Sequence, residues 1–219
     1  MSYYYMGELF IQTKEYKLAV ESYTKCLENI SEDLDSLSSM LISKEQNIKC
    51  RCNLATALFL VRRTVEAFFV IEECLVTDAN NIEAQLIKLR ILMQKDDHLK
   101  AFELAKRLTL ADPNSSMFLY LLGLTQLKMK KPFSSIISFM KCKKINPEFP
   151  NVCLKIAAVY ETISRPQLAL EFLMKHLIYC PNYKLALLRS SKLLAYFGKP
   201  KLARVHLDKL FELLASPVL

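Results

Sequence analysis

The chain has 219 residues and a formal net charge of +8, with 30 lysine and arginine against 22 aspartate and glutamate side chains. Hydrophobic residues make up 52% of it and the mean hydropathy is +0.16, values high enough to predict either surface shared with a partner or a piece of something larger. No apolar run approaches the roughly eighteen residues of a membrane span, and no secretory signal is visible at the start. We therefore expect an intracellular protein, cytoplasmic or nuclear, without membrane insertion.

Turn-like stretches recur along the chain about every 34 residues, a spacing typical of repeat proteins. They read DANNI from Asp78, ADPNS from Ala111, INPEF from Ile145 and CPNYK from Cys180. Between them apolar residues lie three and four apart, as in ALEFLMKHLIYC, which indicates helices and not strands. Proline cannot continue the preceding helix and the following Asn or Ser can cap the next one, so each stretch is predicted to be a corner.

The period predicts an all-α fold of stacked helix pairs in a single domain over residues 1–219. The expected pairs cover residues of about 1–33, 48–81, 82–115, 116–149, 150–183 and 184–217. A small residue on each second helix would let the two helices approach closely: Ala19, Ala67, Ala101, Ser135, Ala169 and Ala203. The facing position on the first helix holds Gly7, Ala55, Leu89, Gly123, Ala157 and Ser191. Leu89 is too large for this position and predicts a splayed or shifted third pair.

An insertion at about residues 32–47 separates the first two pairs. Leu34, Leu37, Leu41 and Ile42 are spaced as one helical face, and the inserted length is close to four whole turns. The pattern favours a lengthened first helix in the second pair, after a short acidic, serine-rich loop. A protruding spur that binds a partner is the alternative.

The first pair, YYYMGELFIQTKEYKLAVESYTKCL, also carries a family signature. Tyr3, Met6-Gly7, Phe10, Ala19 and Tyr23 follow the spacing of the Trp-x2-Leu-Gly-x2-Tyr run, small residue and later aromatic of tetratricopeptide repeats. Over essentially its whole length the chain resembles this family. The resemblance implies a right-handed superhelical solenoid of antiparallel helix pairs. It also implies a non-catalytic protein–protein interaction scaffold, or a subunit of a larger intracellular complex.

In this family the first helix of each pair lines a concave groove, so the resemblance also implies partner-binding residues. The positions that match are Leu86, Ile87, Arg90, Met93, Met117, Tyr120, Leu121, Leu124, Leu127, Lys128, Lys155, Arg189 and Lys192. The groove would be apolar in its middle and basic toward its C-terminal part. It would suit a partner helix or extended apolar segment with acidic residues beside its anchors. Some of these side chains could instead belong to the core between repeats.

Catalysis is not expected, because no phosphate-binding loop, nucleophile elbow or metalloprotease helix occurs. We expect no catalytic residue, no cofactor and no metal site, since the three histidines are scattered and Cys50 and Cys52 lack a second ligand pair. His176 falls at a packing position and is interpreted as a core residue. The carboxylate clamp of chaperone-binding relatives is matched only by Asn53 in the first three repeats, which disfavours that mechanism.

Other expectations concern the edges and ends of the stack. A nucleic-acid-binding helical repeat protein is the alternative function, using a basic ridge on the turns inside each pair: Lys14, Arg62, Arg63, Lys95, Lys130, Lys131, Arg165 and Lys199. We favour the scaffold, because Lys and Arg are spread while the groove is apolar. Neither end shows a polar capping helix, so the terminal repeats are predicted to meet another chain or to continue in a longer protein. The seven cysteines, an odd number, are expected to be free, with Cys26, Cys74 and Cys142 buried between helices.

Overall fold

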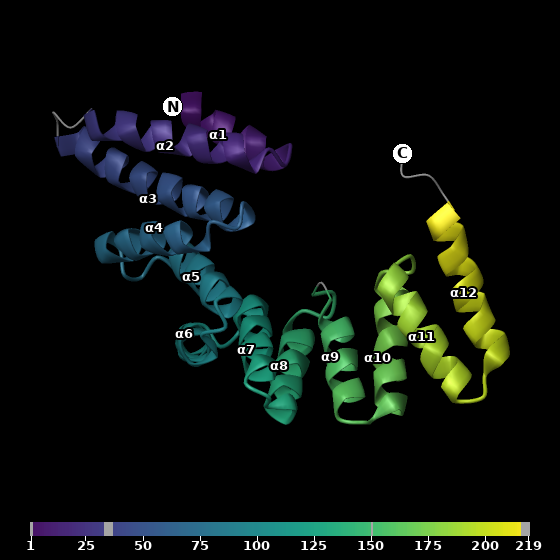
Figure 1. Cartoon of the computed structure of the whole chain (residues 1–219). Coiled ribbons are helices and arrows are strands. Elements are labelled where there is room, and N and C mark those ends of the chain that lie inside the picture. The colour runs from purple at the N-terminus through teal and green to yellow at the C-terminus, as the bar shows by residue number, and fades with distance from the viewer. Residues whose placement is uncertain (1, 33–36, 150, 216–219) are drawn as a thin grey trace. The chain divides into compact units, whose positions relative to one another are not determined.

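The computed structural model describes residues 2–32, 37–149 and 151–215, and side chains outside residues 30–43. This part of the chain consists of helices and turns and contains no strand, which confirms the all-α fold class (Figure 1). The helices are α1 Ser2–Gln12, α2 Tyr16–Glu32, α3 Leu37–Leu60, α4 Thr64–Thr77, α5 Ile82–Gln94, α6 His98–Ala111, α7 Ser116–Lys128, α8 Pro132–Ile145, α9 Val152–Thr162, α10 Pro166–Tyr179, α11 Lys184–Tyr196 and α12 Pro200–Ala215.

The helix boundaries follow local chemistry. Proline is the first residue of α8, α10 and α12, where its missing N–H costs no helical hydrogen bond. At the corners between pairs, the Asn81 side chain accepts a hydrogen bond from the backbone N–H of Ala84 at 2.9 Å, and Ser115 accepts one from Phe118 at 3.4 Å. These are N-caps of α5 and α7. The N-cap residues of α9 and α11, Asn151 and Tyr183, make no side-chain cap hydrogen bond, so the predicted capping occurs at two of the four corners.

The turn inside each pair has one geometry throughout the chain. One residue per turn has a positive φ in the left-handed region: Lys14, Arg62, Asp96, Lys130, Ser164 and Gly198. In five of the six turns this residue carries a side chain, although the conformation disfavours a Cβ by roughly 1 kcal/mol. Only the last pair places glycine there.

Replacing Gly198 with alanine is expected to lower the free energy of unfolding by about 1 kcal/mol. A Cβ at this position would meet no atom within 4 Å, so the cost comes from the backbone and not from a clash. Chemical denaturation followed by circular dichroism measures the change. The reciprocal variant Lys130→Gly, in the equivalent turn with a φ of 57°, should gain stability; a loss there would contradict the backbone explanation.

By its internal contacts the chain divides into two compact units, Met1–Leu104 and Ala105–Leu219, which are described separately. The expected single solenoid over residues 1–219 therefore stays a prediction. Among the described helices, none is both long and apolar enough to cross a membrane.

The first unit is built around the hairpins α1–α2 and α3–α4. Gly7 on α1 faces the fully buried ring of Tyr23 on α2, and a Cβ at Gly7 would lie 2.6 Å from that ring. α3 is the longest helix and starts at Leu37, so the residues from 37 onward lengthen the first helix of the second pair, as expected. Leu34 and the side chains of Leu37, Leu41 and Ile42 lie outside the described residues.

α5 departs from the pattern of the other first helices. Its extensive contacts are with α4 and α3, whereas α1, α3, α7, α9 and α11 each pack along the second helix of their own pair. Leu89 on α5 is fully buried, at the position where the other pairs have Gly, Ala or Ser. The boundary between the two units falls inside α6, the partner helix of α5. This arrangement agrees with the expected irregularity of the third pair.

The second unit contains the hairpins α7–α8, α9–α10 and α11–α12, and each helix from α8 to α11 also packs on its successor. Gly123 on α7 approaches the buried ring of Phe139 on α8, and a Cβ there would lie 2.6 Å from the ring. Val152, Ile156 and Leu173 continue this core into α9 and α10. The small residues expected between paired helices thus mark real close approaches.

The cysteines are free in both units, and six of the seven are buried. Cys26, Cys74 and Cys142 are among the buried ones, which confirms their predicted placement between helices. Burial raises the pKa of Cys142 to about 11, so its reactive thiolate form is scarce at neutral pH. Cys180, after α10, is exposed.

We expect Ellman's reagent to modify one thiol rapidly in the folded protein and the other six only after denaturation. The variant Cys180→Ser should remove the rapid phase and leave the slow one unchanged. Rapid modification of Cys26, Cys74 or Cys142 in the folded chain would contradict their burial.

Candidate partner-binding faces

The residues expected to line the groove are divided between the two units. Four lie on α5 in the first unit: Leu86, Ile87, Arg90 and Met93. The other nine lie on α7, α9 and α11 in the second unit: Met117, Tyr120, Leu121, Leu124, Leu127, Lys128, Lys155, Arg189 and Lys192. That all of them share one concave surface stays a prediction.

Much of the expected apolar patch is used for packing within its own unit. Ile87 and Leu121 are each only 6% exposed. Tyr120, Leu124 and Leu127 are partly buried and pack against the core of the second unit. The Tyr120 ring lies 5.6 Å from Phe139 and 5.0 Å from Phe149, measured between centroids. These side chains support the helices that carry the face.

A smaller set of the expected side chains is accessible in each unit. Arg90 of α5 and Met117, Lys128 and Lys192 of the second unit are exposed. Lys155 and Arg189 are half-buried. The structure thus separates the expected residues into supporting and surface groups.

Arg189 already has an acidic partner inside the second unit. Its Nε donates a hydrogen bond to Glu161 Oε1 at 3.2 Å and its Nη2 donates to Oε2 at 2.7 Å. The pair joins α11 to α9 and is largely shielded, with the side chains 19% and 33% exposed. A bidentate pair of this kind fixes both side chains in place. Arg189 therefore orients neighbouring first helices, and a partner carboxylate would have to displace Glu161 to reach it.

The first unit has a hollow that the residue pattern did not single out. It lies between α1, α2 and α3 and has a volume of about 300 Å³. Its lining comes from all three helices: Glu8, Ile11, Gln12, Tyr23, Asn53 and Thr56. Glu8, Gln12, Asn53 and Thr56 occupy the same repeat positions that define the expected groove in later repeats. Applying those positions to the first two repeats would have found the hollow.

Hydrogen bonds order the wall of this hollow. Asn53 Nδ2 donates to the Tyr4 hydroxyl at 3.1 Å across α3 and α1. Burial, followed by the hydrogen bond with Glu8, raises the pKa of Tyr4 well above its usual value. Burial and the charge of Glu8 raise the pKa of Tyr23 to about 12. Both phenols stay protonated at neutral pH, so Glu8 is the one charged side chain among the residues that line the hollow.

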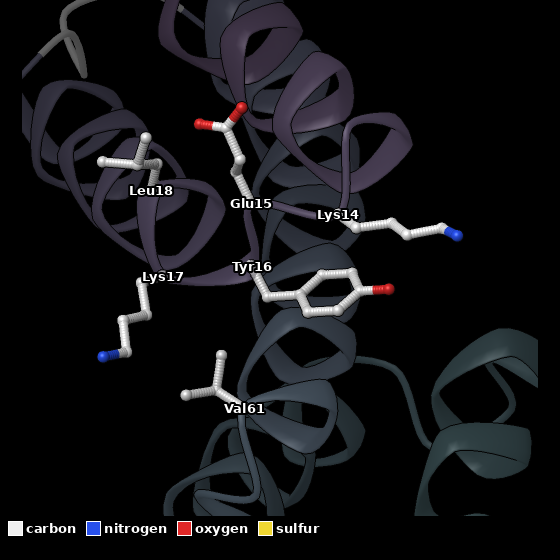
Figure 2. A pocket seen from close by; sticks show the side chains of 6 residues that line it. All are labelled: Lys14, Glu15, Tyr16, Lys17, Leu18 and Val61. Carbon is white, nitrogen blue, oxygen red and sulfur yellow. The ribbon is translucent and has the colours of Figure 1, made fainter.

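A second hollow in the first unit bears on the expected basic ridge. It has a volume of about 480 Å³ and is lined by residues 14–18 and by Val61 at the end of α3. Figure 2 shows the ammonium ends of Lys14 and Lys17 on opposite sides of the group, so they do not converge on one anion. Nearby, Arg63 donates to Glu66 at 2.7 and 2.5 Å. The nucleic-acid alternative gains no support from this part of the ridge.

The described residues bear on two expectations, the one about metal ligands and the one about His176. No group of three or more His, Cys, Asp or Glu side chains in that part of the chain could hold a metal ion. His176 is buried, lies edge-on to Tyr183 with centroids 4.9 Å apart, and has its pKa lowered by burial. This is the core placement that the sequence predicts.

These hairpins and close approaches define a helical-repeat fold. The tetratricopeptide repeat profile matches residues 2–33 and 118–149, the first and fourth expected repeats. Residues 2–33 and 118–149 are therefore tetratricopeptide repeats, and the structural likenesses below concern the fold of the whole chain.

Solved structures of the same fold cover most of the chain. PilF from Pseudomonas aeruginosa superposes with a TM-score of 0.74 at 20% identity, over 97% of this chain and 90% of that one. A tetratricopeptide repeat protein from Parabacteroides merdae gives 0.71 at 16% identity, over 96% and 78%. MamA from Desulfovibrio magneticus gives 0.65 at 15%, over 83% and 94%. At these identities the likeness concerns the fold. No curated protein sequence matches the chain.

Proposed function

We propose that the protein is a non-catalytic interaction scaffold that binds segments of partner proteins on the faces formed by the first helices of its pairs. The observation that carries this proposal is the hollow lined by Glu8, Gln12, Asn53 and Thr56 in the first unit. Polar side chains that converge on a preformed hollow are typical of a recognition site. Such a site needs no reactive group, and none lines this hollow.

The chemistry of the hollow selects its ligand. One carboxylate and the carbonyl oxygens of two amides provide acceptors, and Lys49 lies beside the wall with its Nζ 5.5 Å from the Tyr4 ring centroid. Charge-assisted hydrogen bonds from an ammonium or guanidinium group to such acceptors are strong. The first unit therefore binds a partner segment through a Lys or Arg side chain, and a C-terminal carboxylate is disfavoured there by Glu8.

The face on the second unit has the opposite preference. Met117 offers an exposed apolar contact, and Lys128 and Lys192 add positive charge on α7 and α11. An apolar or amphipathic segment with acidic residues fits this face. Rim charges of this kind should affect the association rate more than the affinity.

A peptide-display selection on the full chain tests the proposal for the first unit. Peptides enriched on the protein should carry Lys or Arg, and Glu8→Gln should weaken their binding about tenfold or more, because it leaves the ligand's charge without its partner. Glu21→Gln, an exposed carboxylate on α2, is the matched control and should leave the affinity unchanged. Enrichment of acidic peptides, or equal effects of the two variants, would contradict the proposal.

A further inference from the structure

The charge of the chain is divided unequally between its two units. Residues 105–219 carry eighteen Lys and Arg against six Asp and Glu, whereas residues 1–104 carry twelve against sixteen. The second unit thus has a formal charge of +12 and the first of −4. From Pro113 to Pro147 there is no acidic residue and there are six lysines. This stretch contains α7 and α8, so neither helix carries a carboxylate of its own.

α8 is apolar on two opposite sides. Its inner side packs into the core through Ser135, Phe139 and Cys142, all fully buried. On its outer side, Phe133, Ile137 and Met140 are 70%, 58% and 43% exposed, and their spacing of four and three residues places them on one stripe. Large apolar side chains that gather on an exposed surface often mark an interaction site. The outer stripe of α8 is therefore an unpartnered apolar face.

The stripe borders a basic hollow. The hollow has a volume of about 510 Å³ and is lined by Ile136, Ile137, Met140, Lys141, Lys143 and Lys144. No carboxylate of the described residues lies within ion-pair distance of these three lysines. An apolar floor with a lysine rim is therefore open to a ligand that supplies both apolar and acidic groups.

We propose that the outer face of α8 is a docking surface for an acidic, amphipathic segment of a protein partner. A large apolar side chain of that segment fills the hollow against Ile137 and Met140, and Phe133 extends the apolar contact. Carboxylates next to this anchor pair with Lys141 and Lys144. The surface lies on the second helix of its pair, so it is independent of the faces on the first helices.

Two other anionic ligands fit this surface less well. Nucleic acids bind through phosphate contacts and base stacking on aromatic side chains, and the α8 stripe has one aromatic ring among aliphatic side chains. An anionic bilayer accepts apolar side chains that project from a helix but does not fill a hollow with a shaped group. A protein segment supplies an apolar anchor and carboxylates together, which matches the apolar stripe and the lysines beside it.

The test uses the full chain and a fluorescein-labelled helical peptide with leucines three and four residues apart and glutamates elsewhere. The same peptide with lysine for every glutamate, polyuridylate, and phosphatidylcholine–phosphatidylserine vesicles are the comparison ligands. We expect the glutamate peptide to bind most tightly. Ile137→Glu, and the double variant Lys141→Glu/Lys144→Glu, should each weaken it about tenfold or more.

The double variant Lys199→Glu/Lys201→Glu is the matched control, because it makes the same charge change on exposed lysines at the start of α12. It should change the affinity by less than about twofold, since added charges away from the site are screened. Equal weakening by both double variants would overturn the proposal and indicate a diffuse charge effect. Tighter binding of the RNA or the vesicles than of the glutamate peptide, or equal binding of the two peptides, would overturn it as well.

Discussion

Replacing Phe139 with alanine is expected to lower the free energy of unfolding by about 3–5 kcal/mol. The ring is fully buried in α8, contacts Tyr120 at a centroid distance of 5.6 Å, and fills the space left by the missing side chain of Gly123. Its loss leaves a cavity that neighbouring helices cannot close without losing their own contacts. Urea denaturation followed by circular dichroism gives the change directly.

The control for this prediction is Gly123→Ala, whose effect on the free energy of unfolding should change sign when Phe139 is also replaced. In the natural sequence Gly123→Ala should be destabilising by about 1–3 kcal/mol, because its Cβ would lie 2.6 Å from the immobile Phe139 ring. In the Phe139→Ala background the obstacle is gone, and the same substitution should gain up to about 1 kcal/mol from the higher helix propensity of alanine. Equal effects in both backgrounds would show that the two residues are not in contact.

Replacing Leu89 with alanine is expected to cost about 2–5 kcal/mol. The family pattern alone points the other way, because alanine is a usual residue at this position and leucine an exception. The structure instead predicts a loss of stability, because Leu89 is fully buried on α5, which packs along α4 and α3. Calorimetric melting of the full chain measures the effect on the first unit.

Two further variants test whether the loss of stability comes from the lost volume of the Leu89 side chain or from any substitution at this position of a repeat. Leu89→Met nearly conserves volume and should cost less than about 1.5 kcal/mol. Ala157→Leu places leucine at the equivalent position of the fifth pair, where alanine is fully buried between α9 and its neighbours, and overpacking should be destabilising. A stabilising Leu89→Ala variant would show that α5 packs like the other first helices.

Two of the proposed partner surfaces differ in the charge that we expect them to bind. The hollow beside Glu8 is proposed to bind positive groups, and the outer face of α8 is proposed to bind negative ones. Each belongs to one unit and depends on contacts within that unit. A partner could thus engage either unit alone, and variants on one unit should leave binding to the other unchanged.

The sequence by itself determines the features that depend on near neighbours along the chain. Helix type follows from apolar spacing, the corners follow from Pro113, Pro147 and Pro181, and close helix approach follows from Gly7 and Gly123. The lengthening of α3 before residue 48 also follows, because Leu34, Leu37, Leu41 and Ile42 are spaced as one helical face. These properties are set within one or two turns of helix or within one hairpin, so a repeated pattern is enough to predict them.

Only the tertiary structure decides which of the patterned side chains are free to bind. Leu121 and Met117 lie on the same helix and both matched groove positions, yet one is 6% and the other 37% exposed, because neighbouring helices cover one side of α7. Arg189 is paired with Glu161, 28 residues away in sequence, and Asn53 meets Tyr4 across 49 residues. Exposure and pairing of this kind depend on the distance and angle between helices, which a 3.6-residue periodicity does not contain.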